Sequence, residues 1–133
     1  MTIDNNDNLW IGGAGNHKVF VFDDNLQYVS NRGAGSSNPI PHDVDANGNI
    51  FTTSGSDGKV IKFNSFSSSL GLGPTVVVDE IWGPRDVALD SLGYLYVAAT
   101  FPGSETHAST RGISIYDSSG TFIRKVWDDR FVS

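Results

Sequence analysis

The stretch VDANGNIF, residues 44–51, decides the fold, because it occurs three times in the chain. It returns as LDSLGYLY at residues 89–96 and as IDNNDNLW at residues 3–10, so that the copies begin 41 and 45 residues apart. Each copy has an aspartate at its second position and a Leu/Ile–aromatic pair at its end. Three copies at such similar spacing indicate a protein built from repeats.

A second block follows each copy of the first. It reads KVFVFD at residues 18–23, KVIKFN at 59–64 and GISIYD at 112–117. Its apolar residues alternate with the period of two that places one face of a strand in a core. The aspartate of the first block begins a D-x-x-G turn, in which the carboxylate accepts turn amides and glycine supplies a positive φ. We therefore expect Asp4, Asp45 and Asp90 to cap turns rather than to bind metal.

Each copy predicts four short strands. The first ends at the turn aspartate, the second holds the Leu/Ile–aromatic pair, and the third is the alternating block. The fourth is expected at residues 27–30, 75–81 and 122–127. Four strands in roughly 40–45 residues are typical of a β-propeller blade. The fold class is therefore all-β, with one three-blade unit over residues 1–133 and blade repeats at about 1–38, 39–83 and 84–133.

The residues also support a resemblance to a known family. The first copy continues into GNHKVFVFD at residues 15–23, and this Asn-His stretch resembles the NHL repeat. The second and third copies resemble it through residues 45–51 and 84–90. The resemblance implies a ring that commonly has six blades. Such propellers include enzymes, protein binders and RNA binders, so the resemblance alone does not select a function.

The two ends of the chain fit each other. Residues 131–133 followed by residues 1–4 form a seven-residue string that matches residues 84–90, as if one first strand were split across the termini. Either two chains join head to tail into a six-bladed homodimer, or the chain is a fragment of a larger NHL-repeat protein. We favour the homodimer, because two-fold symmetry is the commonest way to close an assembly.

The aromatic residues suggest how such a dimer would be held. We expect Trp127 and Phe131 to lie on one side of its seam. On the other side we expect Trp10 with Val19 or Phe20.

Composition excludes several kinds of partner. Fifteen acidic and nine basic residues give a net charge of −6, which disfavours nucleic acid and anionic membranes. There is no cysteine, so neither disulfides nor thiolate metal sites are available. No apolar run approaches the roughly 20 residues of a membrane-spanning helix. The first residues lack the features of a signal peptide, so we expect a soluble chain of undetermined compartment.

The three histidines are candidate site residues. In an NHL-like ring the connections that carry His17 and His107, and the start of the strand that carries His42, open on one face above the central channel. Imidazole is a common metal ligand, so His42 is a candidate ligand for a divalent metal. His17 is also the consensus residue of the repeat, which explains it without a site. We expect no other cofactor.

Arginines near the strand starts form a second group of candidates. We expect Arg32, Arg85 and Asp86 near the mouth of the channel. An arginine there can hold a carboxylate or a phosphate bidentately. It can equally pair with a neighbouring aspartate, and we prefer that interpretation.

The third blade carries an insertion of eight residues between its second and third strands. It contains Glu105, His107 and Arg111 within residues 100–111. An insertion on the open face is where a propeller usually acquires specificity, although a neutral expansion fits equally well.

The functional expectation follows from these residues. We expect a binding or scaffold module with its ligand, an unknown small molecule or protein, on the loop face over the channel, and with no catalytic residue. The alternative is an enzyme. PHDV at residues 41–44 resembles the Pro-His motif of the peptidylglycine amidating lyases and streptogramin lyases, which implies a metal-dependent lyase or lactonase-like activity. Sequence alignment of the blades places His42 opposite Val87.

Overall fold

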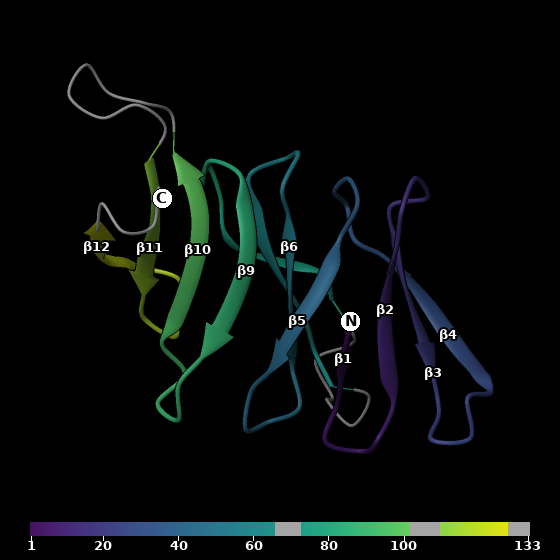
Figure 1. The fold of residues 1–133 in the computed structure, drawn as a ribbon. Coiled ribbons are helices and arrows are strands. Elements are labelled where there is room, and N and C mark those ends of the chain that lie inside the picture. Colours follow the sequence, from purple (N-terminus) through teal and green to yellow (C-terminus); the bar gives the residue numbers. More distant parts are fainter. Residues whose placement is uncertain (66–72, 102–109, 128–133) are drawn as a thin grey trace.

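A computed structural model describes residues 1–65, 73–101 and 110–127, and these residues form three four-stranded antiparallel sheets (Figure 1). Each sheet consists of four strands in sequence order. The first contains β1 (Thr2–Ile3), β2 (Leu9–Gly13), β3 (Lys18–Phe22) and β4 (Tyr28–Gly33). The second contains β5 (Ile40–Val44), β6 (Ile50–Ser54), β7 (Lys59–Phe63) and β8 (Thr75–Val78). The third contains β9 (Pro84–Leu89), β10 (Leu95–Phe101), β11 (Thr110–Tyr116) and β12 (Phe122–Trp127).

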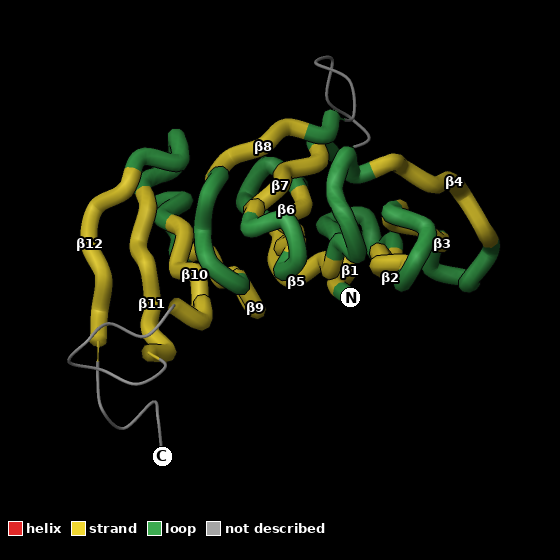
Figure 2. Tube along the Cα trace, turned by 90° about the horizontal axis from the view of Figure 1, so that it is seen from above, coloured by secondary structure: helices red, strands yellow, loops and turns green. Residues whose placement is uncertain are grey.

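The three sheets stand side by side like the blades of a propeller. Seen from above, they form an arc with β1, β5 and β9 on its inner side and β4, β8 and β12 on its outer side (Figure 2). Strand β5 contacts β1 and β2 of the sheet before it and β9 of the sheet after it. The predicted all-β class and its three repeated units are confirmed. We call the contact between the first two sheets the first junction, and that between the last two the second junction.

The repeated aspartates cap their turns as predicted. Oδ1 of Asp45 accepts the backbone amides of Asn47 and Asn49, both at 2.9 Å. Asp4 and Asp90 accept the amides of the equivalent residues, at 2.9–3.0 Å. Gly48 has a φ of 80°, in the left-handed region that glycine enters without a steric penalty. The repeat in the sequence is therefore a repeat of turn chemistry.

The aspartate of the first turn accepts two side-chain hydrogen bonds, whereas Asp45 and Asp90 each accept one. Oδ2 of Asp4 accepts hydrogen bonds from Asn8 Nδ2 at 3.0 Å and from the indole nitrogen of Trp10 at 2.9 Å. Burial alone would raise the pKa of Asp4, but these hydrogen bonds and those from two backbone amides outweigh it and lower the pKa. Asp4 thus ties the turn to the core residue Trp10.

Apolar side chains fill the first junction. Trp10, Val19 and Val21 of the first sheet are fully buried against Ile50, Ile61 and Phe63 of the second. The rings of Trp10 and Phe63 lie 6.0 Å apart at 45°. Alternate residues of β2 and β3 therefore face the second sheet, as a period of two requires.

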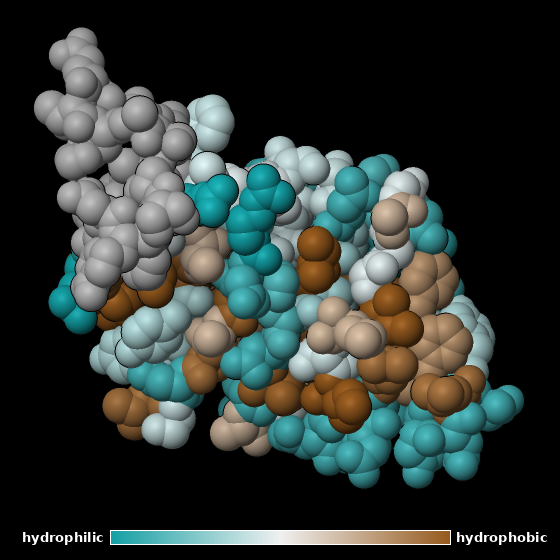
Figure 3. All heavy atoms as spheres, viewed as in Figure 1, coloured by the Kyte–Doolittle hydropathy of each residue, from teal (hydrophilic) through white to brown (hydrophobic). Residues whose placement is uncertain are grey.

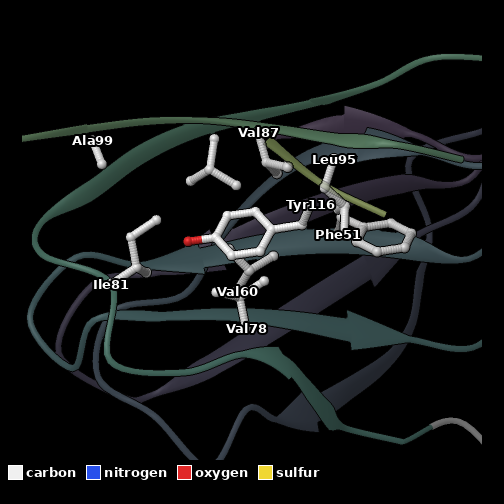
Figure 4. Packing of buried hydrophobic residues seen from close by; sticks show 9 residues of the cluster. Phe51, Val60, Val78, Ile81, Val87, Leu95, Ala99 and Tyr116 are labelled. Carbon is white, nitrogen blue, oxygen red and sulfur yellow. The ribbon is translucent and has the colours of Figure 1, made fainter. Parts of the chain in front are cut away.

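The second junction repeats this arrangement with different residues. Its core is formed by Phe51, Val60, Val78, Ile81, Val87, Leu95, Val97, Ala99 and Tyr116. Figure 4 shows the ring of Tyr116 between Val87 on one side and Val60 on the other. Burial raises the pKa of the Tyr116 hydroxyl.

This sidedness corrects one expectation about the seam. Trp10 and Val19 are fully buried and face the second sheet, so they are not available at the open side of the first sheet. Phe20 faces the open side, because it alternates with Val19 along β3. Phe131 and the side chain of Trp127 lie outside the described part of the chain.

Candidate functional site

One edge of the arc carries the loops on which the site was expected. The β2–β3 and β6–β7 turns (residues 14–17 and 55–58) lie on it with the β4–β5 and β8–β9 links (residues 34–39 and 79–83), at the top of Figure 1. We call this edge the loop face. The aspartate-capped turns lie on the opposite edge, which we call the turn face.

A hollow of about 730 Å³ opens on the loop face at the second junction. Three separate segments form it: the β6–β7 turn, the β8–β9 link with the start of β9, and the end of β10. Its lining residues are Gly55, Ser56, Asp57, Gly58, Glu80, Ile81, Trp82, Gly83, Arg85 and Thr100. The lining combines an indole and an isoleucine with two carboxylates, a guanidinium and two hydroxyls. An apolar surface with a few convergent polar groups is typical of a ligand site.

Backbone hydrogen bonds fix the link that crosses this hollow. The amide of Ile81 donates to the carbonyl of Gly58 at 2.9 Å, and the amide of Thr100 donates to the carbonyl of Gly83 at 3.2 Å. The residues on both sides of Trp82 are thus tied to two different sheets. Glu80, one residue before Ile81, has a φ of 58°, which is uncommon for a residue with a Cβ. The backbone beneath Trp82 is therefore held in one place.

Sequence reasoning missed Trp82, Asp57 and Glu80. Trp82 is 65% exposed although it belongs to a fixed link. The sequence did offer one signal for Trp82. It is a tryptophan in a short segment outside the repeated blocks, where strand packing does not require a large aromatic residue. Asp57 accepts a short hydrogen bond from the backbone amide of Ser37, and this bond lowers the pKa of Asp57. This bond also joins the β6–β7 turn to the β4–β5 link.

Two predicted site residues meet beside this hollow. Nδ1 of His42 lies 2.8 Å from Oδ1 of Asp86, and Nε2 of His42 lies 2.7 Å from Oγ1 of Thr53. Because a carboxylate only accepts, Nδ1 carries the proton, and in the neutral ring Nε2 accepts the hydroxyl proton of Thr53. Burial lowers the pKa of His42 and outweighs the opposing effect of the Asp86 carboxylate.

A β-bulge brings His42 to this position. Along β5 and β6, Pro41 faces Thr52 and Asp43 faces Phe51, so His42 is the extra residue. In β9 the extra residue is Arg85, between Pro84 and Asp86. The predicted alignment of His42 with Val87 is therefore wrong. Val97 and Thr52 occupy equivalent positions in their sheets, and they pair with Val87 and Pro41. Val87 is therefore the counterpart of Pro41, and His42 has no counterpart in the third sheet.

The same geometry bears on the metal hypothesis for His42. Both ring nitrogens are engaged, one by Asp86 and one by the buried Thr53. Among residues 1–65, 73–101 and 110–127, no three His, Asp or Glu side chains gather closely enough to hold a metal ion. The described residues thus place one carboxylate, Asp86, beside His42 but no third ligand.

Arg85 and Arg111 share a second, smaller hollow. This hollow has a volume of about 420 Å³ and is also lined by Ala98, Ala99, Thr100, Gly112 and Ile113. Within the described segments, neither arginine forms an ion pair with a carboxylate, and Asp86 contacts His42. From the sequence, we expect an arginine here to pair with a neighbouring aspartate. Among the described residues, Arg85 does not do so. Arg85 lines both hollows.

The structure separates the other candidates from this site. Arg32 faces Val19 from β4, the outermost strand of its sheet, so it does not lie at the channel mouth as expected. Its guanidinium donates to the carbonyl of Asn31 at 2.8 Å. His17 is exposed at the end of the β2–β3 turn, in the first sheet, and its carbonyl accepts the amide of Ala34 at 3.0 Å. Glu105 and His107 lie outside the described residues.

The side of the arc that would face the channel changes from apolar to hydrophilic along its length. Figure 3 shows apolar surface over β1 and β5 beside a hydrophilic band over β9. Ile3 and Ile40 are 58% and 47% exposed, whereas Arg85 and Asp86 are the exposed residues at the start of β9. The polar groups of the inner side are therefore concentrated at the second junction.

Comparison with known proteins supports the fold. The chain is similar to the crystal structure of a functionally unknown protein from Desulfotomaculum acetoxidans DSM 771, with a TM-score of 0.65 and 12% sequence identity. The match covers 90% of this chain and 36% of that one, so the chain spans about a third of the length of the protein it matches. No protein-family model and no curated protein matches the sequence. The class shown is an all-β, propeller-like repeat.

In the portion of the chain that the structure describes, there is no helix of the length and apolar character needed to cross a membrane.

Proposed function

We propose that the chain is a β-propeller binding module of the NHL type whose ligand occupies the loop face at the second junction. The observation that carries this proposal is the hollow of about 730 Å³ built by three separate segments of that face. Loops held by a rigid scaffold are where binding residues concentrate. The NHL resemblance lies in the repeated turn and Asn-His residues, and the three-sheet fold is compatible with it.

The mixture of polar groups supports binding at this end of the loop face. His42, Asp86 and Arg85 lie on the two inner strands that meet there, and Arg85 also lines the smaller hollow. At the first junction, the carbonyl oxygen of Pro39 approaches Gly12 so closely that a Cβ there would overlap it.

A competing hollow lies on the turn face. It is smaller, about 220 Å³, and is lined by Lys62, Thr75 and Ser118 among others. This competitor makes the proposal testable. We would screen a library of small neutral, cationic and anionic fragments against the ¹⁵N-labelled protein and map the amide shifts.

Binding on the loop face should move the amides of Gly58, Ile81, Gly83 and Thr100. Shifts confined to Thr75, Gly93 and Ser118 would place the site on the turn face and refute the proposal. An absence of any specific shift on the loop face across the library would refute it as well.

We also propose that a second copy of the chain closes the ring. By strand register, Tyr96 of β10 is the counterpart of Trp10, and Phe22 of β3 is the counterpart of Phe63. Trp10 and Phe63 pack against each other at the first junction, but Tyr96 is 37% exposed and Phe22 is only partly buried. The two open sheet faces thus carry the two halves of an internal contact.

Two further residues on the open faces also correspond to residues that are buried at the internal junctions. Phe20 corresponds to Ile61, and Ile113 corresponds to Val60, both of which are fully buried at their own junctions. Burying one large apolar side chain is worth about 2 kcal/mol, and two-fold symmetry gives two such seams. A head-to-tail homodimer with six blades results.

Sedimentation equilibrium tests this assembly. The chain should sediment as a dimer, and Phe20→Glu should shift it toward monomer while an outer-strand change such as Arg124→Glu should not. A stable, folded monomer in the unmodified chain would refute the dimer. The open faces would then belong against further blades of a longer protein.

A further inference from the structure

We infer that the second-junction hollow takes a saccharide, with one face of a sugar ring stacked on the indole of Trp82. This inference rests on the proposed function of the hollow and adds the chemical class of its ligand. It starts from the exposure of Trp82, which is 65% although residues on both sides are hydrogen-bonded to neighbouring sheets.

Packing does not account for this tryptophan. The first junction has an equivalent link, anchored by the same type of bond, from the amide of Ala34 to the carbonyl of His17 at 3.0 Å. The residue that follows this anchor is Gly35, whereas Trp82 follows the anchor residue Ile81. The fold therefore accepts the smallest residue at this position. Trp82 also lies between the second and third sheets, so closure of the ring would not bury it.

An exposed indole on a fixed backbone is suited to stacking. Its backbone is already ordered, so the entropy cost of holding it against a ligand is small. A pyranose ring offers a flat face of C–H bonds that packs on an aromatic surface, and its hydroxyls point outward from the edge of that face. The hollow that Trp82 lines also carries polar side chains that can bond to such hydroxyls.

The charges of the hollow disfavour an anionic ligand. Asp57 and Glu80 are carboxylates and Arg85 is a guanidinium, so an anion would meet two like charges. A cation stacked on Trp82 would meet the carboxylates and Arg85 together, and the cationic fragments of the library test that ligand class against the sugars. A sugar hydroxyl both donates and accepts, so it satisfies either kind of group through charge-assisted hydrogen bonds. Ser56 and Thr100 add two hydroxyls of the same adaptable kind.

The smaller hollow beside Arg111 does not carry the same inference. It shares Arg85 and Thr100 with the larger hollow but has no aromatic side chain in its described lining. It is a place where a longer oligosaccharide would extend, because the two hollows meet at Arg85.

The test uses defined sugars and two variants of Trp82. We would titrate the full chain with the methyl glycosides of glucose, galactose, mannose and N-acetylglucosamine to about 50 mM, following saturation-transfer NMR and tryptophan fluorescence. At least one glycoside should bind, with its ring C–H protons receiving the strongest saturation. Trp82→Ala should weaken that binding by at least about tenfold, and Trp82→Phe should retain part of it.

A matched control and the melting temperature separate binding from folding. Leu92→Ala removes a side chain that is 75% exposed on the turn face and should leave the affinity unchanged. If none of the four glycosides binds while another fragment shifts the amides of the hollow, the saccharide class is wrong and the binding module stands. If no fragment shifts those amides either, both fail. Sugar binding that persists in a folded Trp82→Ala protein would also overturn the stacking inference.

Discussion

The two junctions between sheets have the same strand order and both have an apolar core, but the contacts between their inner strands differ. At the first, Trp10 fills the core and the carbonyl of Pro39 packs directly on Gly12. At the second, polar groups bridge the sheets: Oδ2 of Asp43 accepts the amide of Leu89 at 2.8 Å, and His42 contacts Asp86. We call the first junction the closed junction and the second, which carries the hollow of about 730 Å³, the open junction. A repeat protein can thus vary one junction while the turns that define its blades remain the same.

The strongest test of the closed junction is Trp10→Ala. Trp10 is fully buried, and its indole nitrogen donates to Asp4. We expect the free energy of unfolding to fall by about 4 kcal/mol, because the change creates a cavity and removes a buried hydrogen bond. Chemical denaturation measures the loss. Leu92→Ala, on an exposed side chain, should stay within about 0.5 kcal/mol. A comparable loss in both variants would show that the first junction is not the packed region.

A pair of glycine variants compares the two junctions at similar contacts. A Cβ at Gly12 would overlap the carbonyl oxygen of Pro39, whereas a Cβ at Gly55 would lie 3.3 Å from the carbonyl oxygen of Pro84. Gly12→Ala should therefore cost about 2–3 kcal/mol through overpacking, and Gly55→Ala less than about 1 kcal/mol. Thermal denaturation of both variants checks this order. Equal losses of stability in Gly12→Ala and Gly55→Ala would contradict the looser packing that we infer beside the hollow.

The sequence predicted what is local and repeated. The aspartate-capped turns follow from Asp45 and Gly48, because a carboxylate, two amides and a glycine with positive φ all lie within a few residues. The strands follow from their period of two. The number of strands and their grouping into three sheets were therefore readable from the printed residues alone.

What the sequence could not show depends on position in space. Residues 39–45 and 84–90 have equal lengths, so an alignment pairs His42 with Val87. The ladders place the extra residue at His42 in one strand and at Arg85 in the other, and nothing in the composition reveals this. Trp82 was missed because it lies in a link outside the repeat. The contact between His42 and Asp86 joins residues of different blades, which repeats alone do not relate.

Asp43 tests whether polar contacts hold the open junction. Its Oδ2 accepts the amide of Leu89, and its Oδ1 accepts the amide of Val44. Asp43→Ala should lower the free energy of unfolding by about 1–2 kcal/mol, because it leaves a backbone amide of the neighbouring sheet without its acceptor. Asp43→Asn, which keeps one acceptor oxygen, should cost less. Thr2 faces Trp10 as Asp43 faces Phe51, so Thr2→Ala is the matched change at the closed junction. If Thr2→Ala costs as much as Asp43→Ala, the contrast between the junctions fails.

The smallest expected effect is a pH dependence near neutral pH that arises from His42 at the open junction. Burial lowers the pKa of His42 below the usual value of 6.5, so the unfolded chain binds the proton more tightly than the folded one. The stability that this neutral histidine contributes is therefore complete above about pH 6.5 and is lost as the pH falls toward the folded-state pKa. Asp86 opposes the shift but does not reverse it.

The melting temperature should fall between about pH 7.5 and pH 5.5, and it should fall less in His42→Gln. His17→Asn, at an exposed histidine with a φ of 57° that asparagine accepts, should keep the full pH dependence. Identical pH profiles for the unmodified chain and His42→Gln would show that His42 is not held neutral at the second junction.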